Sequence, residues 1–293
     1  MSKTYLYHSF PRKTGKDTSL GLKVLNSILE YGLLLTPELL KLPKFDGLPK
    51  ENFIQRRVCF TALTFGDLPL HAKAFGSFSL EFEGRDLREL SALPALYFSG
   101  SLQSGKLFNR AGLELIRHLL EAFNDFRRLE TYSKKGASSR KFAKKLLSKI
   151  HPAKVPFESM AFTLQALLNL CYPTDDVKWT EPLHYYHQHE WKIIPNFSVD
   201  GKTWHFPYVE NNYVLRSHLI KMNPAFFAKK LNGKPLVDYC LSFEQVASKQ
   251  VVKSIRRIIA PAEFVNESRE LLSKRGLNIP VVALPSSKSA AAS

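Results

Sequence analysis

Residues 183–194, LHYYHQHEWKII, hold the densest group of side chains in this sequence that could perform chemistry. In a β-strand successive side chains alternate between two faces. That alternation would put His187, His189 and Trp191 on one side, with Gln188, Glu190 and Lys192 on the other. Two histidines at positions i and i+2 could bind Zn²⁺, but a closed zinc site needs four ligands. No cysteine or acid pair with ligand spacing stands nearby, so the sequence predicts no metal site.

Glu190 is then the residue in this segment that needs an explanation. It lies between His189 and Trp191 and leads into apolar positions, so partial burial is expected. A buried carboxylate is costly unless it is paired or functional. Two readings stay open, a structural salt bridge to Lys or Arg and a catalytic acid. A ribonuclease that uses His184, His187 and His189 is a third, separate possibility.

The surrounding pattern predicts strands broken by a few helices. Strands are expected over residues 5–10, 56–63, 75–84 and 93–100, with a helix over 20–30 that ends before Gly32 and a turn at Thr36–Pro37. Asp200–Gly201 predicts a hairpin, with Glu190 at the start of its first strand. A strand, a helix over 262–274, Gly276 and a last strand follow. The expected fold class is α+β with a central, mainly antiparallel sheet.

A basic helical insertion is expected inside that sheet domain. Apolar residues recur at helical spacing from about Leu107, and the predicted insertion covers residues 107–172. It divides the sheet domain into an N-terminal half, 1–106, and a C-terminal half, 173–285, with a disordered tail at 286–293. Its cationic residues would form a ridge opposite Phe142, Leu146 and Ile150. The ridge consists of Arg140, Lys141, Lys144, Lys145 and Lys149.

The charge balance indicates a polyanionic partner. Lys and Arg number 42 against 26 acids, a formal net charge of +16 with a pI near 9.7. Such a surface attracts nucleic acid through counterion release, and the ridge is the candidate phosphate-binding face. The alternative is a solvated cationic helix with no ligand.

Several classes of protein find no support in the sequence. The three cysteines lie far apart without a CxxC pair, no secretory leader is recognisable, and no apolar run is long enough to span a membrane. A cytoplasmic protein that does not enter the membrane is therefore expected. The sequence also contains no P-loop, GxGxxG, HExxH or GxSxG motif.

Four pieces of the sequence, taken in order, resemble a known family. They are YHSF…GLKVLNSILEYGLLLTPE, RRVCFTAL…LPLHAKAFGSFSLEFEGRDLRELSALPALYF, KWTEPLHYYHQHEWKII and IRRIIAPAEFVNESRELLSKRGLNIPVVAL. Together they resemble the AbiGi-like abortive-infection family of bacterial phage-resistance proteins. The resemblance implies an anti-phage role, with a cognate toxin or antitoxin as a possible partner.

A more distant resemblance is to the ADP-ribosyltransferase-like fold, which would use NAD as co-substrate. It implies that His8 binds the nicotinamide ribose, that Phe60 and Thr61 occupy the nicotinamide-stacking position, and that Glu190 is the catalytic acid. The stacking residue in that fold is usually Tyr, so Tyr7 and Tyr97 are both considered as substitutes, and a degenerate site is the other reading. One carboxylate could stabilise the oxocarbenium-like centre that forms when the nicotinamide–ribose bond breaks.

Two main hypotheses of function follow. The first is an NAD-dependent ADP-ribosyltransferase that modifies nucleic acid or protein during phage defence. The second is a non-enzymatic antitoxin or nucleic-acid-binding module on a degenerate transferase scaffold. The ribonuclease stays as the third.

Overall fold

The computed structural model describes most of the chain. The described residues are 4–12, 19–41, 52–98, 107–134, 138–139, 141–142, 145, 164–168, 170–173, 189–195, 197–199, 202–204 and 206–286.

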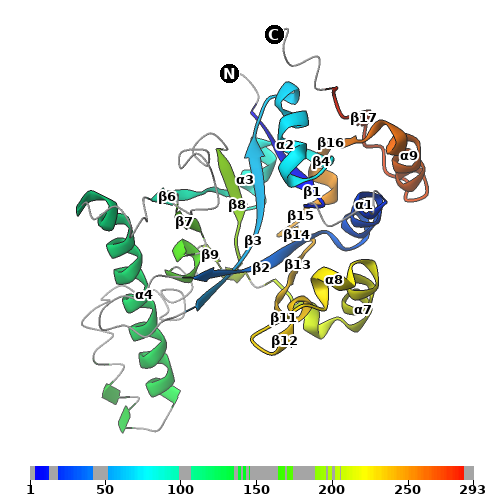
Figure 1. The fold of residues 1–293 in the computed structure, drawn as a ribbon. Helices are drawn as coiled ribbons and strands as arrows, with labels where there is room; N and C mark the ends of the chain where they lie inside the picture. The colour runs from blue at the N-terminus through cyan, green and yellow to red at the C-terminus, as the bar shows by residue number, and fades with distance from the viewer. Residues whose placement is uncertain are drawn as a thin grey trace.

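The centre of the molecule is a mixed, mostly antiparallel sheet with nine strands in the described part of the chain (Figure 1). Its main path runs β13 (Leu241–Phe243), β2 (Leu33–Lys41), β3 (Asn52–Ala62), β1 (Tyr5–Phe10), β4 (Phe78–Glu83), β16 (Ile255–Ala260) and β17 (Val281–Ala283). Off this path, β8 (Glu190–Ile193) pairs with β3 and with β5 (Leu93–Pro94). The predicted α+β class with a mainly antiparallel sheet is confirmed.

Helices and short turns connect these strands. The helices are α1 (Leu20–Tyr31), α2 (Leu68–Phe75), α3 (Gly84–Glu89), α4 (Leu107–Lys134), α7 (Tyr213–Met222), α8 (Pro224–Phe227) and α9 (Val265–Ser273). The 3₁₀ turns are η1 (Phe65–Asp67), η3 (Val209–Asn211), η4 (Leu236–Tyr239), η5 (Val252–Ser254) and η6 (Ala262–Phe264). Two-stranded pairs form between β6 (Leu96–Phe98) and β7 (Cys171–Pro173), β9 (Phe197–Val199) and β10 (Lys202–Trp204), β11 (Lys230–Leu231) and β12 (Lys234–Pro235), and β14 (Gln245–Val246) and β15 (Lys249–Gln250).

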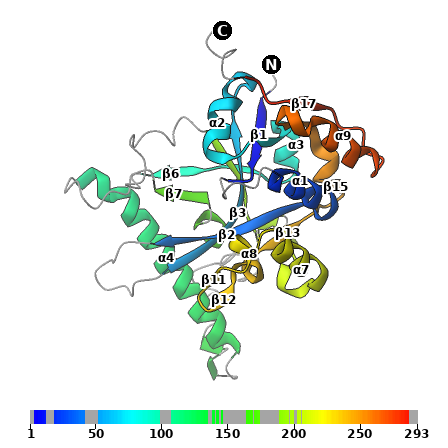
Figure 2. The same cartoon turned by 45° about the vertical axis from the view of Figure 1, so that its right-hand side comes forward.

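One face of the sheet is apolar and packs against α1 and α9. Leu6, Phe60 and Leu80 are buried on it, and the α1 residue Leu25 and the α9 residue Leu272 belong to the same core cluster. Helices α1, α7 and α9 lie together on the side of the molecule away from α4 (Figure 2). Burial of these side chains is the main source of stability, at about 25 cal/mol per Å² of apolar surface.

The opposite face carries a row of polar side chains. Residues that pair directly across antiparallel strands point to the same side of a sheet. Glu190 pairs with Thr61, Thr61 with Tyr7, Tyr7 with Glu81, and Glu81 with Arg257. Five strands thus contribute one polar residue each to a single row, part of which α2 covers through Leu68.

The described part of the expected insertion is flanked by two strands that form a separate two-stranded pair. Strand β6 precedes α4, and β7, which follows the insertion in sequence, pairs with β6 in parallel. Ile116, Leu120 and Phe123 of α4 pack against Leu168 and Cys171. The rest of α4 projects from the body (Figure 1). The boundaries at 107 and 172 stay a prediction, and most of the tail, 287–293, lies outside the described residues.

Two local predictions are wrong. The turn expected at Thr36–Pro37 is part of the continuous strand β2, which pairs with β3 through Thr36–Lys41. Proline has no backbone N–H to donate, so it is tolerated in a strand only where no neighbouring strand needs that hydrogen bond. Strand β13 pairs with residues 33–35 of β2, so the edge of β2 opposite β3 has no partner strand at Pro37 in the described chain. The hairpin at Asp200–Gly201 is present as β9–β10, but Glu190 belongs to the separate strand β8.

No helix in the part of the chain that the structure describes combines the length and the hydropathy that a membrane crossing requires.

Candidate functional site

Glu190 begins β8 and points to the polar face of the sheet. Its pairing with Thr61 fixes that orientation, and its backbone N–H donates a hydrogen bond of 3.2 Å to the Tyr97 hydroxyl. The side chain of Glu190 is 12% exposed. Of the residues predicted for the site, Glu190, Thr61 and Tyr97 are therefore close together.

Glu190 forms an ion pair with its own strand neighbour. The distance from Lys192 Nζ to Glu190 Oε2 is 3.5 Å, and Lys192 is 0% exposed. The alternation rule had placed these two residues on the same face, and this is confirmed. Burial and the nearby Arg57 guanidinium lower the pKa of Lys192, while Glu190 opposes that effect. The structural reading of Glu190, a salt bridge to a lysine, is thus realised.

A buried polar network extends from this pair toward the helical segment. Arg57 donates hydrogen bonds to Gln55 and to Glu38, with which it also forms an ion pair. Gln55 Nε2 donates to the backbone carbonyls of Leu168, at 2.6 Å, and Cys171, at 3.1 Å. Side chains of β3 therefore tie the sheet to the segment that packs against α4.

Two described side chains near Glu190, Cys59 and Tyr97, lack the lowered pKa of an activated nucleophile. Burial raises the pKa of the Cys59 thiol to about 12, so the thiol is protonated at neutral pH. Burial and the charge of Glu190 also raise the pKa of the Tyr97 phenol well above its ordinary value.

His8 lies on the other face of the sheet. In β1 the side chain of His8 points to the same face as Leu6 and Phe10, whereas Tyr7 points to the opposite face. The centroid of the His8 ring lies 5.7 Å from that of Phe60. Its Nδ1–H donates to the Cys59 carbonyl at 2.9 Å, because a carbonyl can only accept. Burial lowers the pKa of His8 to about 4, so the ring is neutral at physiological pH.

Phe60 cannot stack a nicotinamide ring in this arrangement. It is 0% exposed and packs edge to face against Phe82, with ring centroids 5.4 Å apart. The residue paired with it across the strands is Trp191, whereas Glu190 pairs with Thr61. The expected site is therefore divided, with His8 and Phe60 on the apolar face and Glu190 and Thr61 on the polar face.

A second polar cluster on the Glu190 face was not predicted from the sequence. The Tyr7 hydroxyl donates to Glu81 Oε2 at 2.7 Å, and Arg257 forms an ion pair with the same oxygen. The Arg257 guanidinium also lies over the Phe65 ring, 4.5 Å from its centroid. Burial and Glu81 raise the pKa of Tyr7, so its phenol stays protonated and continues to donate.

An open pocket of about 520 Å³ borders this second cluster. Its polar lining consists of Tyr5, Glu81, Lys253, Arg256, Arg257 and Asn278. The sequence signal that could have indicated it is the pair of arginines in IRRIIA, where a regular strand would alternate.

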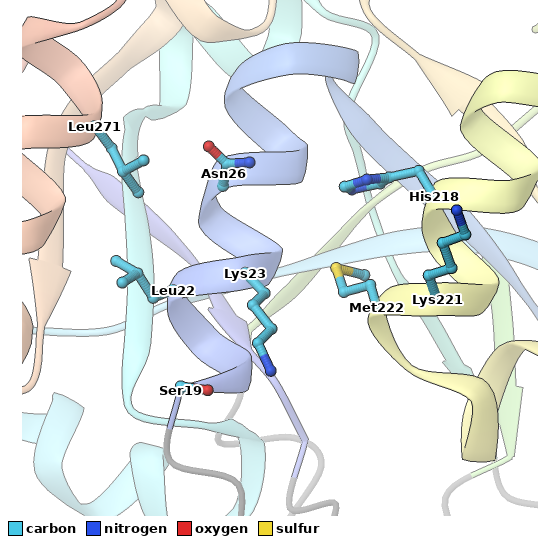
Figure 3. A pocket seen from close by; sticks show the side chains of 8 residues that line it. All are labelled: Ser19, Leu22, Lys23, Asn26, His218, Lys221, Met222 and Leu271. Atoms are coloured by element: carbon cyan, nitrogen blue, oxygen red, sulfur yellow. The ribbon is translucent and has the colours of Figure 1, made fainter.

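A groove of about 530 Å³ lies between α1 and α7, with α9 at its edge (Figure 3). The α1 residues Lys23 and Asn26 face the α7 residues His218 and Met222 across it. Most of the lining is apolar, from Leu22, Met222 and Leu271. None of the residues predicted for a site lines it.

The predicted basic ridge is described only in part. Lys141 and Lys145 are exposed and helical, whereas Arg140, Lys144 and Lys149 lie outside the described residues. Phe142, expected to be on the packed face, is 68% exposed, so that expectation is wrong for this residue. In α4 itself, Arg117 forms ion pairs with Glu114 and Glu121, which reduces the free charge of that helix.

Among the described residues no group of three or more His, Cys, Asp or Glu side chains could hold a metal ion. His184 and His187 lie outside those residues, and His189 is exposed with a φ of 39°, outside strand geometry.

Comparison of the chain with protein-family models, with curated proteins and with solved structures finds no match. The resemblances to the AbiGi-like family and to the ADP-ribosyltransferase-like fold therefore stay predictions.

Proposed function

We propose that this chain is a non-enzymatic nucleic-acid-binding protein, acting in the anti-phage setting that its resemblance to the AbiGi-like family implies. The observation that carries the proposal is the division of the expected transferase site. An NAD molecule held by His8 and Phe60 would lie on the opposite side of the sheet from Glu190, behind a fully buried Phe60. Glu190 is instead paired with Lys192.

The charge distribution supports nucleic acid as the partner. The sequence carries a formal net charge of +16. Lys141 is exposed, and no ion pair of this residue is found among the described residues. Such charges bind phosphates with release of counterions, which makes the affinity depend steeply on salt. The face proposed for contact is the basic ridge, Arg140, Lys141, Lys144, Lys145 and Lys149.

Fluorescence anisotropy with labelled RNA and DNA tests the proposal. We expect binding whose log Kd rises linearly with log salt between about 50 and about 200 mM, with a slope of about 0.7 to 0.9 for each phosphate contacted. Lys141→Glu with Lys145→Glu should weaken binding at least about tenfold. The matched control reverses Lys229 and Lys230, exposed residues at the β11 end of the molecule, and should have a smaller effect.

The same samples separate this proposal from the two enzymatic alternatives. Wild type and Glu190→Gln should bind nucleic acid equally and release no nicotinamide from NAD. Transfer of label from NAD that is lost in Glu190→Gln would overturn the proposal in favour of the transferase. Cleavage of the RNA that chelator abolishes would favour the ribonuclease, and no binding at about 50 mM salt would remove the nucleic-acid partner.

A further inference from the structure

The pocket of about 520 Å³ beside Glu81 has the composition of an anion site, and a β-bulge builds it. Ile255 pairs with Phe82 and Arg257 pairs with Glu81, so Arg256 is one extra residue on β16. A regular strand would send Arg256 and Arg257 to opposite faces. A bulge re-aims side chains, and here both arginines line the same pocket.

Arg257 is held in place before any ligand arrives. The carboxylate of Glu81, itself 5% exposed, accepts hydrogen bonds from Arg257 and from Tyr7, and the guanidinium lies over the Phe65 ring. Arg257 Nε is buried and has no hydrogen-bond partner within the described part of the chain. A cation that is already ordered loses less conformational entropy on binding, so it contributes more to affinity.

The other two cations of the pocket are available. Lys253 and Arg256 are exposed, and no ion pair of either is found among the described residues. Glu81 is the one carboxylate among the described lining residues. Three cations against one carboxylate leave two positive charges. A phosphomonoester carries close to two negative charges at pH 7, whereas a phosphodiester carries one.

The rest of the lining suits a nucleotide-sized ligand. Tyr5, Ile255 and Pro280 provide apolar wall, and Asn278 provides an amide. The volume of about 520 Å³ is within the range of small-molecule sites, roughly 300 to 1,000 Å³. An aromatic ring beside a cationic centre can contact a base while the phosphate is bound.

We propose that this pocket binds a phosphomonoester group, either of a free nucleoside monophosphate or of the terminal phosphate of a nucleic acid. The pocket itself is independent of the basic ridge. Only the second of the two ligands, the terminal phosphate of a nucleic acid, rests on the proposed function.

Paired probes with and without the phosphate test the proposal on the full chain. They are adenosine 5′-monophosphate against adenosine, and a 5′-phosphorylated oligonucleotide against the same oligonucleotide with a 5′-hydroxyl. Calorimetry for the nucleosides and anisotropy for the oligonucleotides measure Kd at fixed salt. We expect wild type to prefer at least one phosphorylated probe by about tenfold or more, in keeping with charge-assisted bonds to arginine.

Lys253→Gln with Arg256→Gln should remove that preference, because these exposed residues supply two of the three cations. The double variant should keep the wild-type Tm, since neither side chain has an ion pair among the described residues. Lys229→Gln with Lys230→Gln removes the same charge elsewhere and should keep the preference. Arg257 is left intact because it also holds Glu81.

The outcomes separate this inference from the proposed function. A preference for the monophosphate alone supports a free nucleotide, and a preference for the phosphorylated oligonucleotide alone supports a nucleic-acid end. Salt-sensitive binding of both oligonucleotides, with no preference for the phosphorylated member of either probe pair, would overturn the phosphate site and leave the proposed function standing. Binding of the monophosphate with no oligonucleotide binding would support the phosphate site and overturn the proposed function. A preference retained in the double variant would overturn the assignment to this pocket.

Discussion

At the scale of single residues, Glu190 forms a nearly buried ion pair, which is the structural alternative to the catalytic role predicted from the sequence. Its ion pair with Lys192 is almost fully removed from water. The Arg57 guanidinium, which carries the same positive charge as Lys192, lies nearby. Attraction between buried charges only offsets their loss of hydration when the pair is complete. The carboxylate thus keeps Lys192 and Arg57 compatible with the core.

The double-mutant cycle of Glu190 and Lys192 should reveal this role. Glu190→Gln should lower the free energy of unfolding by about 3 kcal/mol, because it leaves Lys192 buried without a counter-charge. Adding Lys192→Met should restore most of that loss, since an apolar side chain suits the site. Urea denaturation of wild type, both single variants and the double variant measures the coupling. Additive effects would contradict a buried pair.

His8 predicts a dependence of stability on pH. Its pKa is lowered from an ordinary 6.5 to about 4 by burial. Between these values the unfolded chain binds the proton first, so stability is full above about pH 6.5 and falls until about pH 4. At about 1.4 kcal/mol for each pKa unit, a pKa lowered from 6.5 to about 4 sets an upper limit of about 3.4 kcal/mol, and we expect a loss of about 2 kcal/mol.

Urea denaturation at several pH values, compared with His8→Asn, isolates this contribution. Asparagine can still donate to the Cys59 carbonyl but does not titrate. The variant should lose less stability than wild type between about pH 7 and about pH 4.5. Part of the acid sensitivity should remain, because burial also lowers the pKa of His71 to about 4. Equal pH dependence in both proteins would contradict a buried neutral His8.

At the scale of elements, two helices are followed by glycines with a positive φ, and only one of these glycines is also tightly packed. Gly32 follows α1 with a φ of 78°, and a Cβ there would lie 2.3 Å from the Phe243 carbonyl oxygen of β13. Gly276 follows α9 with a φ of 64°, and a Cβ there would meet nothing within 4 Å. Both glycines were recognisable from sequence as helix ends, but only the fold shows that one of them is also a close contact between elements.

Alanine at these two positions should separate the cost of conformation from the cost of packing. Gly276→Ala should lower the free energy of unfolding by about 1 kcal/mol, from the positive φ alone. Gly32→Ala should cost at least about 3 kcal/mol, because backbone atoms of β13 must also move. Gly66→Ala, whose φ is not positive and whose nearest neighbour would be 3.7 Å away, is the control. Equal losses at positions 32 and 276 would contradict the close approach.

At the scale of the whole molecule, the sheet separates two kinds of surface. One face packs against α1 and α9 as an apolar core, and the other carries charge from β8 to β16. At its β16 end this second face borders the pocket of about 520 Å³, whose lining has an excess of positive charge. At its β8 end lies the Glu190–Lys192 ion pair, in which the two charges neutralise each other. A molecule with a net charge of +16 is expected to attract polyanions. Which of its cationic side chains could bind them depends on the ion pairs that the fold forms.

The sequence by itself determined the local features of this protein. Alternation predicted β1 over the residues that it occupies and placed Glu190 and Lys192 on one face, because the side-chain period of a strand is two. It also found β4, but the strand begins at Phe78, since Phe75 is the last residue of α2. Helix periodicity found α1 and α9, and Asp200–Gly201 indicated the β9–β10 hairpin. The net charge of +16 also follows from composition, and it is the reason that a polyanionic partner is proposed.

Only the tertiary structure decided which residues share a site. Whether His8 faces Glu190 depends on the registers of β1 with β3 and of β3 with β8, and a slip of one residue moves a whole strand to the other face. The bulge at Arg256 likewise comes from the pairing of β16 with β4, which are far apart in sequence. Register is set by packing between distant segments, so local pattern cannot show that the expected site is divided. The arginine pair in IRRIIA marks a cationic position, but the bulge that turns both side chains to one pocket depends on the pairing with β4.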